Sequence, residues 1–210
     1  MNFSPDYLKE TALIAESIDV ADIEKIINIL LHVRNDSGRL FFLGMGGSAS
    51  NCSHAVNDFR KIAEIEAYAP TDNVSEFSAR VNDDGLGSSF ALWLEGSRLQ
   101  RKDCVFVMSV GGGDPVRQVS SNIVHAIDFA KSVGASVVGI VGRDGGYTAK
   151  KADACVIIPS VNPDTITPHT EAFQGVICHL IVSHPLIKAA HTKWESMDSM
   201  DSLETKPLNG

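Results

Sequence analysis

The sequence lacks the features that mark a membrane protein, a secreted protein or a cysteine-based metal site. No stretch approaches the ~20 consecutive apolar residues that a membrane-spanning helix needs. The N-terminus has neither the basic start nor the apolar core of a signal peptide. The 4 cysteines are scattered without a C-x-x-C pair, and Cys104 and Cys155 lie in apolar runs, which is typical of reduced core cysteines. We therefore expect a protein that does not contact the membrane and resides in the cytoplasm.

Basic residues are also scarce. The 210 residues include 18 Lys and Arg against 26 Asp and Glu, which gives a formal net charge of −8. No cluster of Lys and Arg is longer than the pairs at 101–102 and 150–151. This balance argues against direct binding to nucleic acid. The hydrophobic fraction of 44% is enough for one well-packed domain.

Apolar runs and helical patterns alternate along the chain. Helix-period hydrophobic residues over 7–33 predict two N-terminal helices, and Asp19 or Asp22 is a suitable start for the second. Further helices are predicted at 48–62, at 115–133 with Asp114 as the N-cap, and at 167–184. Strands are predicted at 39–43, around Tyr68, and at 103–108, 136–141 and 155–158.

The predicted strands are continuous apolar runs, which is typical of a parallel sheet covered on both faces. The sequence therefore predicts an α/β fold, a doubly wound three-layer αβα sandwich with a parallel sheet of about five strands and N-terminal helices. Residues 1–192 are expected to form a single domain. The polar segment 193–210 is expected to be a mobile tail.

A glycine-rich segment, Gly-Met-Gly-Gly-Ser at 44–48, directly follows the first apolar strand. A strand that enters such a turn and then a helix leaves backbone N–H groups free at the positive end of the helix dipole. The segment matches neither the P-loop nor the dinucleotide-binding pattern. It indicates a phosphate or similar anion without identifying the ligand, and a tight structural turn is the alternative.

Two more glycine-rich turns follow predicted strands, at 109–115 and 142–146. The carboxyl ends of parallel strands meet at one edge of a sheet, and ligands bind outside that edge where the strand order reverses. The three turns together therefore predict a ligand site at this edge.

His54 and Asp58 are four residues apart on a predicted helix and share one face of it. This spacing suits two ligands of one metal or an acid/base pair, and a surface hydrogen bond is the alternative. Glu171 and His179 are eight residues apart on another helix, ~12 Å along an ideal axis. For one metal ion to bind both residues, the helix must start irregularly or the side chains must reach far along it. Otherwise the ligands must come from two subunits.

The order of these motifs resembles the sugar isomerase (SIS) domain family, and most closely its phosphoheptose isomerase branch. The glycine-rich segment 44–48, followed by His54 and Asp58, resembles the first site motif of that branch. The segments 82–83, 109–114 and 142–146 resemble its Gly-Asn-Asp, Ser-Thr-Ser-Gly-Asn-Ser and Gly-Lys-Asp-Gly-Gly motifs. Glu171 and His179 lie where the branch has Gln and His.

The chain also departs from the branch. Met45 replaces an Asn, Asp58 a Glu and Glu171 a Gln. In the phosphate loop Val110 and Gly111 replace hydroxyl residues, although the glycine amides that follow are able to form an anion nest. These changes point to a different sugar or to a role in binding rather than catalysis.

The resemblance implies the following substrate-binding residues: Met45, Gly46, Gly47, Ser48, Asn82, Asp83, Ser109, Val110, Gly111, Asp114 and Glu171. For Asp83 a role as a turn residue is the alternative, and for Asp114 a helix cap. The metal ligands implied are His54, Asp58, Glu171 and His179. Such a donor set suits a divalent cation such as zinc.

The implied activity is aldose–ketose isomerisation of a sugar phosphate, such as sedoheptulose 7-phosphate, through an enediol. Asp58 and His179 are the candidate proton-transfer groups. The resemblance also implies a homotetramer with sites at subunit interfaces. The alternatives are a non-catalytic SIS protein that binds a sugar phosphate or a protein partner, and, less favoured, a flavodoxin-like nucleotide-binding protein.

Overall fold

Five short segments pair as one parallel sheet in the computed structural model, which describes residues 2–193. The strands are β1 (Arg39–Leu43), β2 (Glu66–Tyr68), β3 (Cys104–Ser109), β4 (Ser136–Val141) and β5 (Ala154–Ile157). They lie in the order β2-β1-β3-β4-β5, and each neighbouring pair is parallel. The predicted parallel sheet is confirmed.

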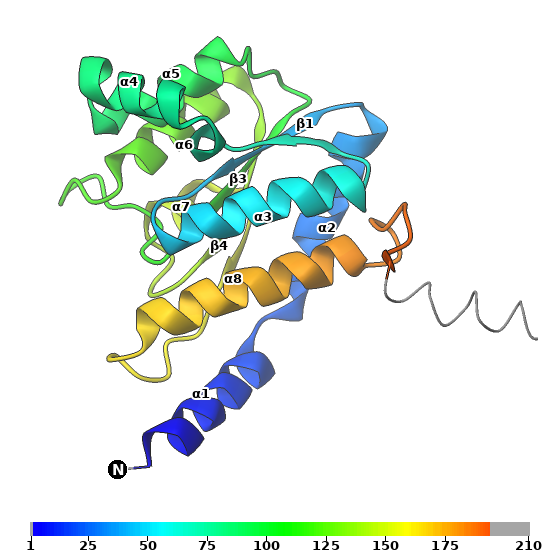
Figure 1. Ribbon diagram of the computed structural model, residues 1–210, viewed down its shortest axis with the longest axis vertical. Coiled ribbons are helices and arrows are strands. Elements are labelled where there is room, and N and C mark those ends of the chain that lie inside the picture. The colour runs from blue at the N-terminus through cyan, green and yellow to red at the C-terminus, as the bar shows by residue number, and fades with distance from the viewer. Residues whose placement is uncertain (1, 194–210) are drawn as a thin grey trace, which may run out of the picture.

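Both faces of the sheet are buried at its centre because successive side chains of β1, β3 and β4 enter different cores. In β1, Leu40 and Phe42 face one core, whereas Phe41 and Leu43 face the other. The first core contains residues of α2 (Val20–Asn35), α3 (Gly47–Lys61) and α8 (Ile166–Ser183). The second contains residues of α5 (Leu86–Gly96) and α6 (Ser121–Val133). Figure 1 shows these helices on the two sides of the sheet, as the predicted three-layer sandwich requires.

The first helix, α1 (Phe3–Ser17), extends beyond the three layers (Figure 1) and buries only Ile14. The Glu10 carboxylate links it to the segment that leads into α8. It accepts hydrogen bonds from Asn162 and Thr165, and lies 2.9 Å from Nε2 of His169. The predicted pair of N-terminal helices is confirmed, and Asp19 caps α2 by accepting from the N–H of Ala21.

The strand order reverses between β1 and β3, which lie next to each other in the middle of the sheet. The chain leaves β1 into the glycine-rich segment 44–48 and leaves β3 into the segment that follows Ser109. A positive φ of 60° at Gly46 turns the chain directly into α3. The fold thus places two glycine-rich turns side by side at the edge where α/β proteins bind ligands.

The prediction that Asp114 caps a helix over 115–133 is wrong, because α6 begins at Ser121. Asp114 and Val119 form an antiparallel bridge that closes the intervening residues into a short loop. The Asp114 carboxylate does accept from the N–H groups of Val116 and Arg117, at 2.9 and 3.0 Å. Asp114 therefore stabilises a local turn, and the chain does not continue from this turn into a helix.

Three short helices have no counterpart in the sequence-based prediction: α4 (Val74–Asp84), α5 (Leu86–Gly96) and α7 (Gly146–Lys151). A single 3-10 turn, η1 (Pro70–Asp72), precedes them. Asn82 and Asp83, predicted to bind substrate or to form a turn, lie exposed in the last turn of α4.

No helix within residues 2–193 is long and apolar enough to cross a membrane. The predicted boundary of the domain at residue 192 stays a prediction, because all of the polar segment 193–210 except Lys193 lies outside the described residues.

Candidate functional site

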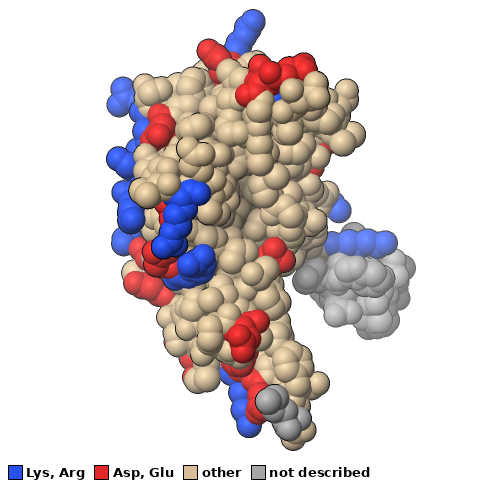
Figure 2. All heavy atoms as spheres, turned by 90° about the vertical axis from the view of Figure 1, so that its left-hand side faces the viewer, with Lys and Arg blue, Asp and Glu red and all other residues tan. Residues whose placement is uncertain are grey.

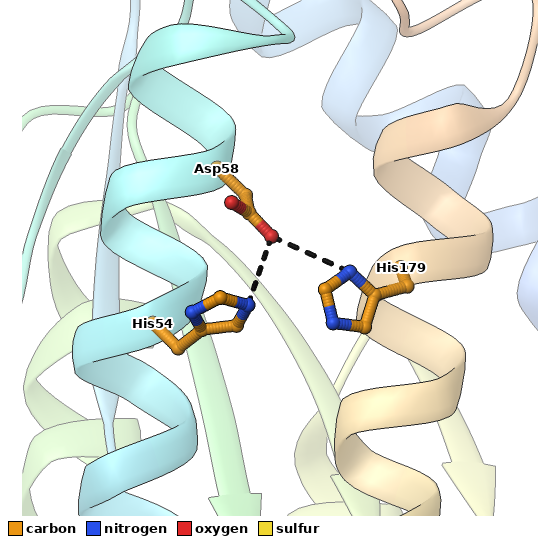
Figure 3. Close-up of side chains that lie close together, drawn as sticks. All are labelled: His54, Asp58 and His179. Atoms are coloured by element: carbon orange, nitrogen blue, oxygen red, sulfur yellow. Dashed lines mark ion pairs between the residues drawn. The ribbon is translucent and has the colours of Figure 1, made fainter. Parts of the chain in front are cut away.

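Three polar side chains from two adjacent helices converge on one point (Figure 3). His54 and Asp58 lie one turn apart on α3, and His179 on α8 points toward Asp58. Oδ2 of Asp58 lies 3.2 Å from Nε2 of His54 and 3.4 Å from Nδ1 of His179. We refer to these three residues as the His–Asp cluster.

The position of the cluster follows from the way α3 and α8 pack. Both helices bury an apolar stripe in the same core, including Phe59 of α3 and Ile177 of α8, so the polar positions beside these stripes come together. The Asp58 side chain is 12% exposed, whereas those of His54 and His179 are 56% and 57% exposed. A mostly buried carboxylate therefore lies between two accessible imidazoles.

Further contacts hold the cluster in place. Oδ1 of Asp58 accepts a hydrogen bond of 2.9 Å from Nδ2 of Asn57, which leaves Oδ2 to face both histidines. The two imidazole rings lie edge to face, with centroids 5.1 Å apart. Behind Asp58, burial and the Asp58 charge raise the pKa of the Cys178 thiol, so this cysteine is a core residue rather than a nucleophile.

The cluster fits a divalent metal. One ligand atom from each residue lies within 4.8 Å of the other two. Two imidazole nitrogens and one carboxylate oxygen form the donor set that catalytic zinc sites use while keeping a position open for water or substrate. Three of the four predicted ligands therefore come together.

Glu171, the fourth predicted metal ligand, does not join the cluster in this chain. It lies two turns before His179 on α8, and its carboxylate packs against Gly47 at the start of α3. A Cβ atom on Gly47 would fall 2.3 Å from Oε2 of Glu171. The carboxylate thus faces the glycine-rich segment instead of the two histidines.

A cavity of about 290 Å³ lies where the turns after β1 and β3 meet. We call it the hydroxyl pocket, because three serines contribute to its wall: Ser48, Ser109 and Ser120. Ser109 Oγ also accepts a hydrogen bond of 3.1 Å from the N–H of Gly112, which shapes the turn. The remaining lining residues are Met45, Val110, Gly111, Val119, Ile123 and Arg143.

The hydroxyl pocket contains some of the predicted substrate-binding residues and not others. Those that line it are Met45, Ser48, Ser109, Val110 and Gly111. Gly46 and Gly47 shape the turn beside it. Asn82 and Asp83 on α4 are not part of its wall, and Asp114 lines a neighbouring cavity instead. The backbone N–H groups of Arg117 and Val116 lower the pKa of Asp114 and engage its carboxylate.

Sequence reasoning missed Ser120 and Arg143. Ser120 precedes α6, with a left-handed φ of 51°, and so carries a hydroxyl into the pocket six residues after the expected position at Asp114. The Ser-Ser-Asn sequence at 120–122 before an apolar helical pattern was the available signal for a helix start there. Arg143 lay in a turn that was identified, but its charge was not assigned a role.

Comparison with known proteins first defines the class. The family model of the SIS domain matches residues 6–142 of the chain. The chain is also 30% identical over 184 residues to a protein named probable phosphoheptose isomerase from Thermoplasma volcanium, and this match covers 85% of the chain and 90% of the relative.

Solved structures show the same fold. A phosphoheptose isomerase from Neisseria gonorrhoeae superposes with a TM-score of 0.71 at 24% identity, covering 85% of this chain and 97% of that chain. One from Francisella tularensis gives a TM-score of 0.72 at 19% identity, covering 87% and 98%. The chain belongs to the SIS-domain family and, within it, to the phosphoheptose isomerase branch. It is therefore an enzyme of the sugar-phosphate isomerase class.

Proposed function

We propose that this enzyme interconverts the aldose and ketose forms of sedoheptulose 7-phosphate or a closely related sugar phosphate through an enediol. The observation that carries the proposal is the convergence of His54, Asp58 and His179 from two helices. Its relative from Thermoplasma volcanium is named a probable phosphoheptose isomerase. A non-catalytic binding protein is not favoured, because such a protein has no need for this set of side chains.

The phosphate of the substrate is assigned to the hydroxyl pocket. Ser48, Ser109 and Ser120 present hydroxyl groups there, and Arg143 contributes a positive charge. The pocket adjoins the N-termini of α3 and α6, where free N–H groups and the helix dipoles favour an anion. Along α3, His54 lies ~9 Å beyond Ser48, a separation that a seven-carbon sugar phosphate can span.

The His–Asp cluster is assigned a divalent metal, with zinc as the expected ion. When bound, the ion would polarise the carbonyl oxygen and stabilise negative charge on the enediolate. Glu171 is proposed to contact the substrate where it faces the glycine-rich segment, or to complete a metal site with side chains of a second subunit.

Asp58 and His179 are assigned the proton transfers. The reaction needs a group that removes the proton from the carbon next to the carbonyl and a group that returns it to the neighbouring carbon. Asp58 lies between the imidazoles and orients both of them. The Nε2 atom of His179 forms no hydrogen bond or ion pair within residues 2–193, so it remains available to hold a proton.

We further propose a homotetramer in the cytoplasm. Exposed large apolar side chains on α1 and α8 are suited to a subunit interface: Phe3, Leu8, Leu13, Val176 and Leu180. All four cysteines are free, as expected for a reducing compartment.

The test is an NMR assay with sedoheptulose 7-phosphate, on protein whose metal content is measured in parallel. We expect the aldose phosphate to form, and we expect Asp58→Asn and His179→Ala to lower kcat/KM by about 100-fold or more. His125→Ala is the matched control, because His125 is an exposed histidine that contacts Gly87 away from the cluster. Unchanged activity in both cluster variants would contradict the proposal.

A further inference from the structure

A second and larger cavity, of about 590 Å³, adjoins the hydroxyl pocket. One wall is the loop that Asp114 and Val119 close, and the other is the turn after β4 together with α7. Arg117, Arg143 and Lys150 all line it, and we call it the basic cavity. Its volume is in the range of small-molecule binding sites.

The three cations of the basic cavity form only one ion pair, a long one, among the described residues. Within residues 2–193, neither Arg143 nor Lys150 forms an ion pair with a carboxylate. Arg117 contacts Asp114 only at 3.8 Å, and its side chain is 76% exposed. The chain as a whole has a net charge of −8, so a cavity lined by three cations is exceptional in it. In Figure 2, Lys and Arg side chains gather along one side of the face that lies on the left of Figure 1.

The acidic and hydroxyl groups of the cavity are engaged elsewhere. Asp114 accepts from two backbone N–H groups of its own loop, and Asp144 accepts from the N–H of Gly146. The Tyr147 hydroxyl donates to Asp128, which raises the pKa of Tyr147 to about 12. These hydrogen bonds fix the orientation of the two carboxylates without removing their charge, so the three cations of the lining exceed its two carboxylates by one.

The two cavities are continuous in their lining. Gly111, Val119 and Arg143 belong to both, and the space beside the Cα of Gly111 is open to at least 4 Å. Arg143 adopts a positive φ of 53°, which is uncommon for a residue other than glycine and places its side chain at the junction. The Arg143 guanidinium is therefore able to contact an anion in the hydroxyl pocket or one in the basic cavity.

We propose that the basic cavity binds a second phosphate group, in addition to the phosphate that the proposed function assigns to the hydroxyl pocket. Arg117 and Lys150 hold this group from opposite walls, and Arg143 contacts it from the junction. The group is either the second phosphate of a sugar bisphosphate, which would then be the substrate, or the phosphate of a separate molecule.

Equilibrium dialysis against radiolabelled inorganic phosphate tests the proposal. We expect two phosphates per chain, and one in the double variant Arg117→Ala/Lys150→Ala, with affinity at the second site lowered about 10-fold or more. The matched control is Arg101→Ala/Lys102→Ala. This control also removes one Arg and one Lys, but from exposed positions at the opposite edge of the sheet, before β3. We expect it to bind two phosphates per chain, as the wild type does.

A reciprocal variant separates this inference from the proposed function. Ser48→Ala/Ser120→Ala removes hydroxyls of the first pocket and is expected to keep the phosphate bound by Arg117 and Lys150. If the wild type binds one phosphate, and only the serine variant loses it, the basic cavity is not an anion site and the inference fails. If only the Arg117/Lys150 variant loses it, the inference stands and the phosphate assignment of the proposed function fails.

Competition with sedoheptulose 7-phosphate then identifies the source of the second group. Displacement of one labelled phosphate per chain shows that this monophosphate occupies one of the two sites, and if a sugar bisphosphate also displaces only one, the second anion is a separate molecule. A sugar bisphosphate that displaces both, in the wild type but not in Arg117→Ala/Lys150→Ala, shows that one ligand fills the two cavities. Equal phosphate binding by the wild type and Arg117→Ala/Lys150→Ala overturns the proposal.

Discussion

The carboxylate of Glu171 on α8 packs against the Cα of Gly47, the first residue of α3, so closely that a Cβ atom there would fall 2.3 Å from Oε2. Two segments far apart in sequence pack against each other here, and only glycine at position 47 leaves room for the Glu171 side chain. The contact fixes where Glu171 points, and it explains why the segment 44–48 carries glycine at a position with no positive φ.

We predict that Gly47→Ala displaces Glu171 without unfolding the protein. Glu171 is a flexible side chain that can rotate away, so the free energy of unfolding should change by only about 0.5 kcal/mol. Activity should fall about 10- to 100-fold, as expected when a contact group is misplaced by about 1 Å. Steady-state kinetics and urea denaturation measure the two effects.

A double-mutant cycle provides the control for this prediction. In a Glu171→Ala background, Gly47→Ala should have no further effect on kcat/KM, because the displaced group is already absent. Gly175→Ala on α8 introduces the same methyl group into open space and should leave activity unchanged. Additive losses in the cycle would show that Gly47 acts independently of Glu171.

Metal removal should abolish activity and lower the melting temperature. Because the His–Asp cluster exists as a set only in the folded chain, a bound ion at 100 times its Kd stabilises the fold by about 2.7 kcal/mol. We expect dialysis against a chelator to remove this stabilisation and added zinc to restore it. Calorimetry and elemental analysis measure the change.

Asp58→Asn is the informative comparison for metal removal, because it keeps the size of the side chain and removes its charge. Its melting temperature should be independent of zinc. His125→Ala should respond to zinc as the wild type does. Full activity in protein shown to be free of metal would refute a metal-assisted reaction.

The link between α1 and α8 should depend on pH through Glu10. Hydrogen bonds from Asn162 and His169 lower the pKa of Glu10 from its ordinary value of 4.5. A pKa that is lower in the folded state stabilises the fold above the unfolded pKa, and this contribution is lost as pH falls through the folded pKa. The contribution of Glu10 should therefore be complete at pH 7 and fade below about pH 4.5.

Glu10→Gln tests this dependence. The variant should melt below the wild type at pH 7, and the difference should shrink as the pH is lowered below the ordinary Glu pKa. Glu16→Gln, an exposed change on the same helix, is the control and should not alter the melting temperature. A Glu10→Gln difference that stays constant from pH 7 down to acid would contradict the role of the ionised carboxylate.

Asp103→Asn should be among the most destabilising single substitutions. The fully buried Asp103 carboxylate pairs with Arg39 at 2.7 Å and accepts from the N–H groups of Arg39 and Gln100. The substitution leaves Arg39 without its counterion at the start of β1, which we expect to cost about 3 kcal/mol. Urea denaturation should show this loss with an unchanged m-value, whereas the exposed Glu66→Gln on β2 should change little.

Much of the fold could be predicted from the sequence because its signals are local. The strands 39–43 and 136–141 coincide with β1 and β4, since a continuous apolar run between turn residues has few alternatives. The short helices α4, α5 and α7 were missed, because helices of six to eleven residues carry a weak periodic signal. The start of α6 was misplaced because Asp114 and Pro115 fit a helix start and a turn equally well.

The candidate site was only partly predictable. The pairing of His54 with Asp58 follows from their spacing on one helix, and their shared face is fixed by helix geometry. The resemblance to a known family suggested His179, but the contact itself depends on how α8 packs on α3. No spacing along the chain indicates that Glu171 lies apart from the cluster. None indicates that Ser120 contributes to the hydroxyl pocket.

The sequence by itself determined the α/β class, the parallel sheet and the edge at which its glycine-rich turns gather, because each depends on neighbours along the chain. Only the tertiary structure decided which side chains meet: His179 with Asp58, Glu171 with Gly47, and Arg117, Arg143 and Lys150 around one cavity. The physical reason is that such contacts depend on the packing of whole helices and loops against the sheet. Small differences in where a helix begins change which side chains face each other.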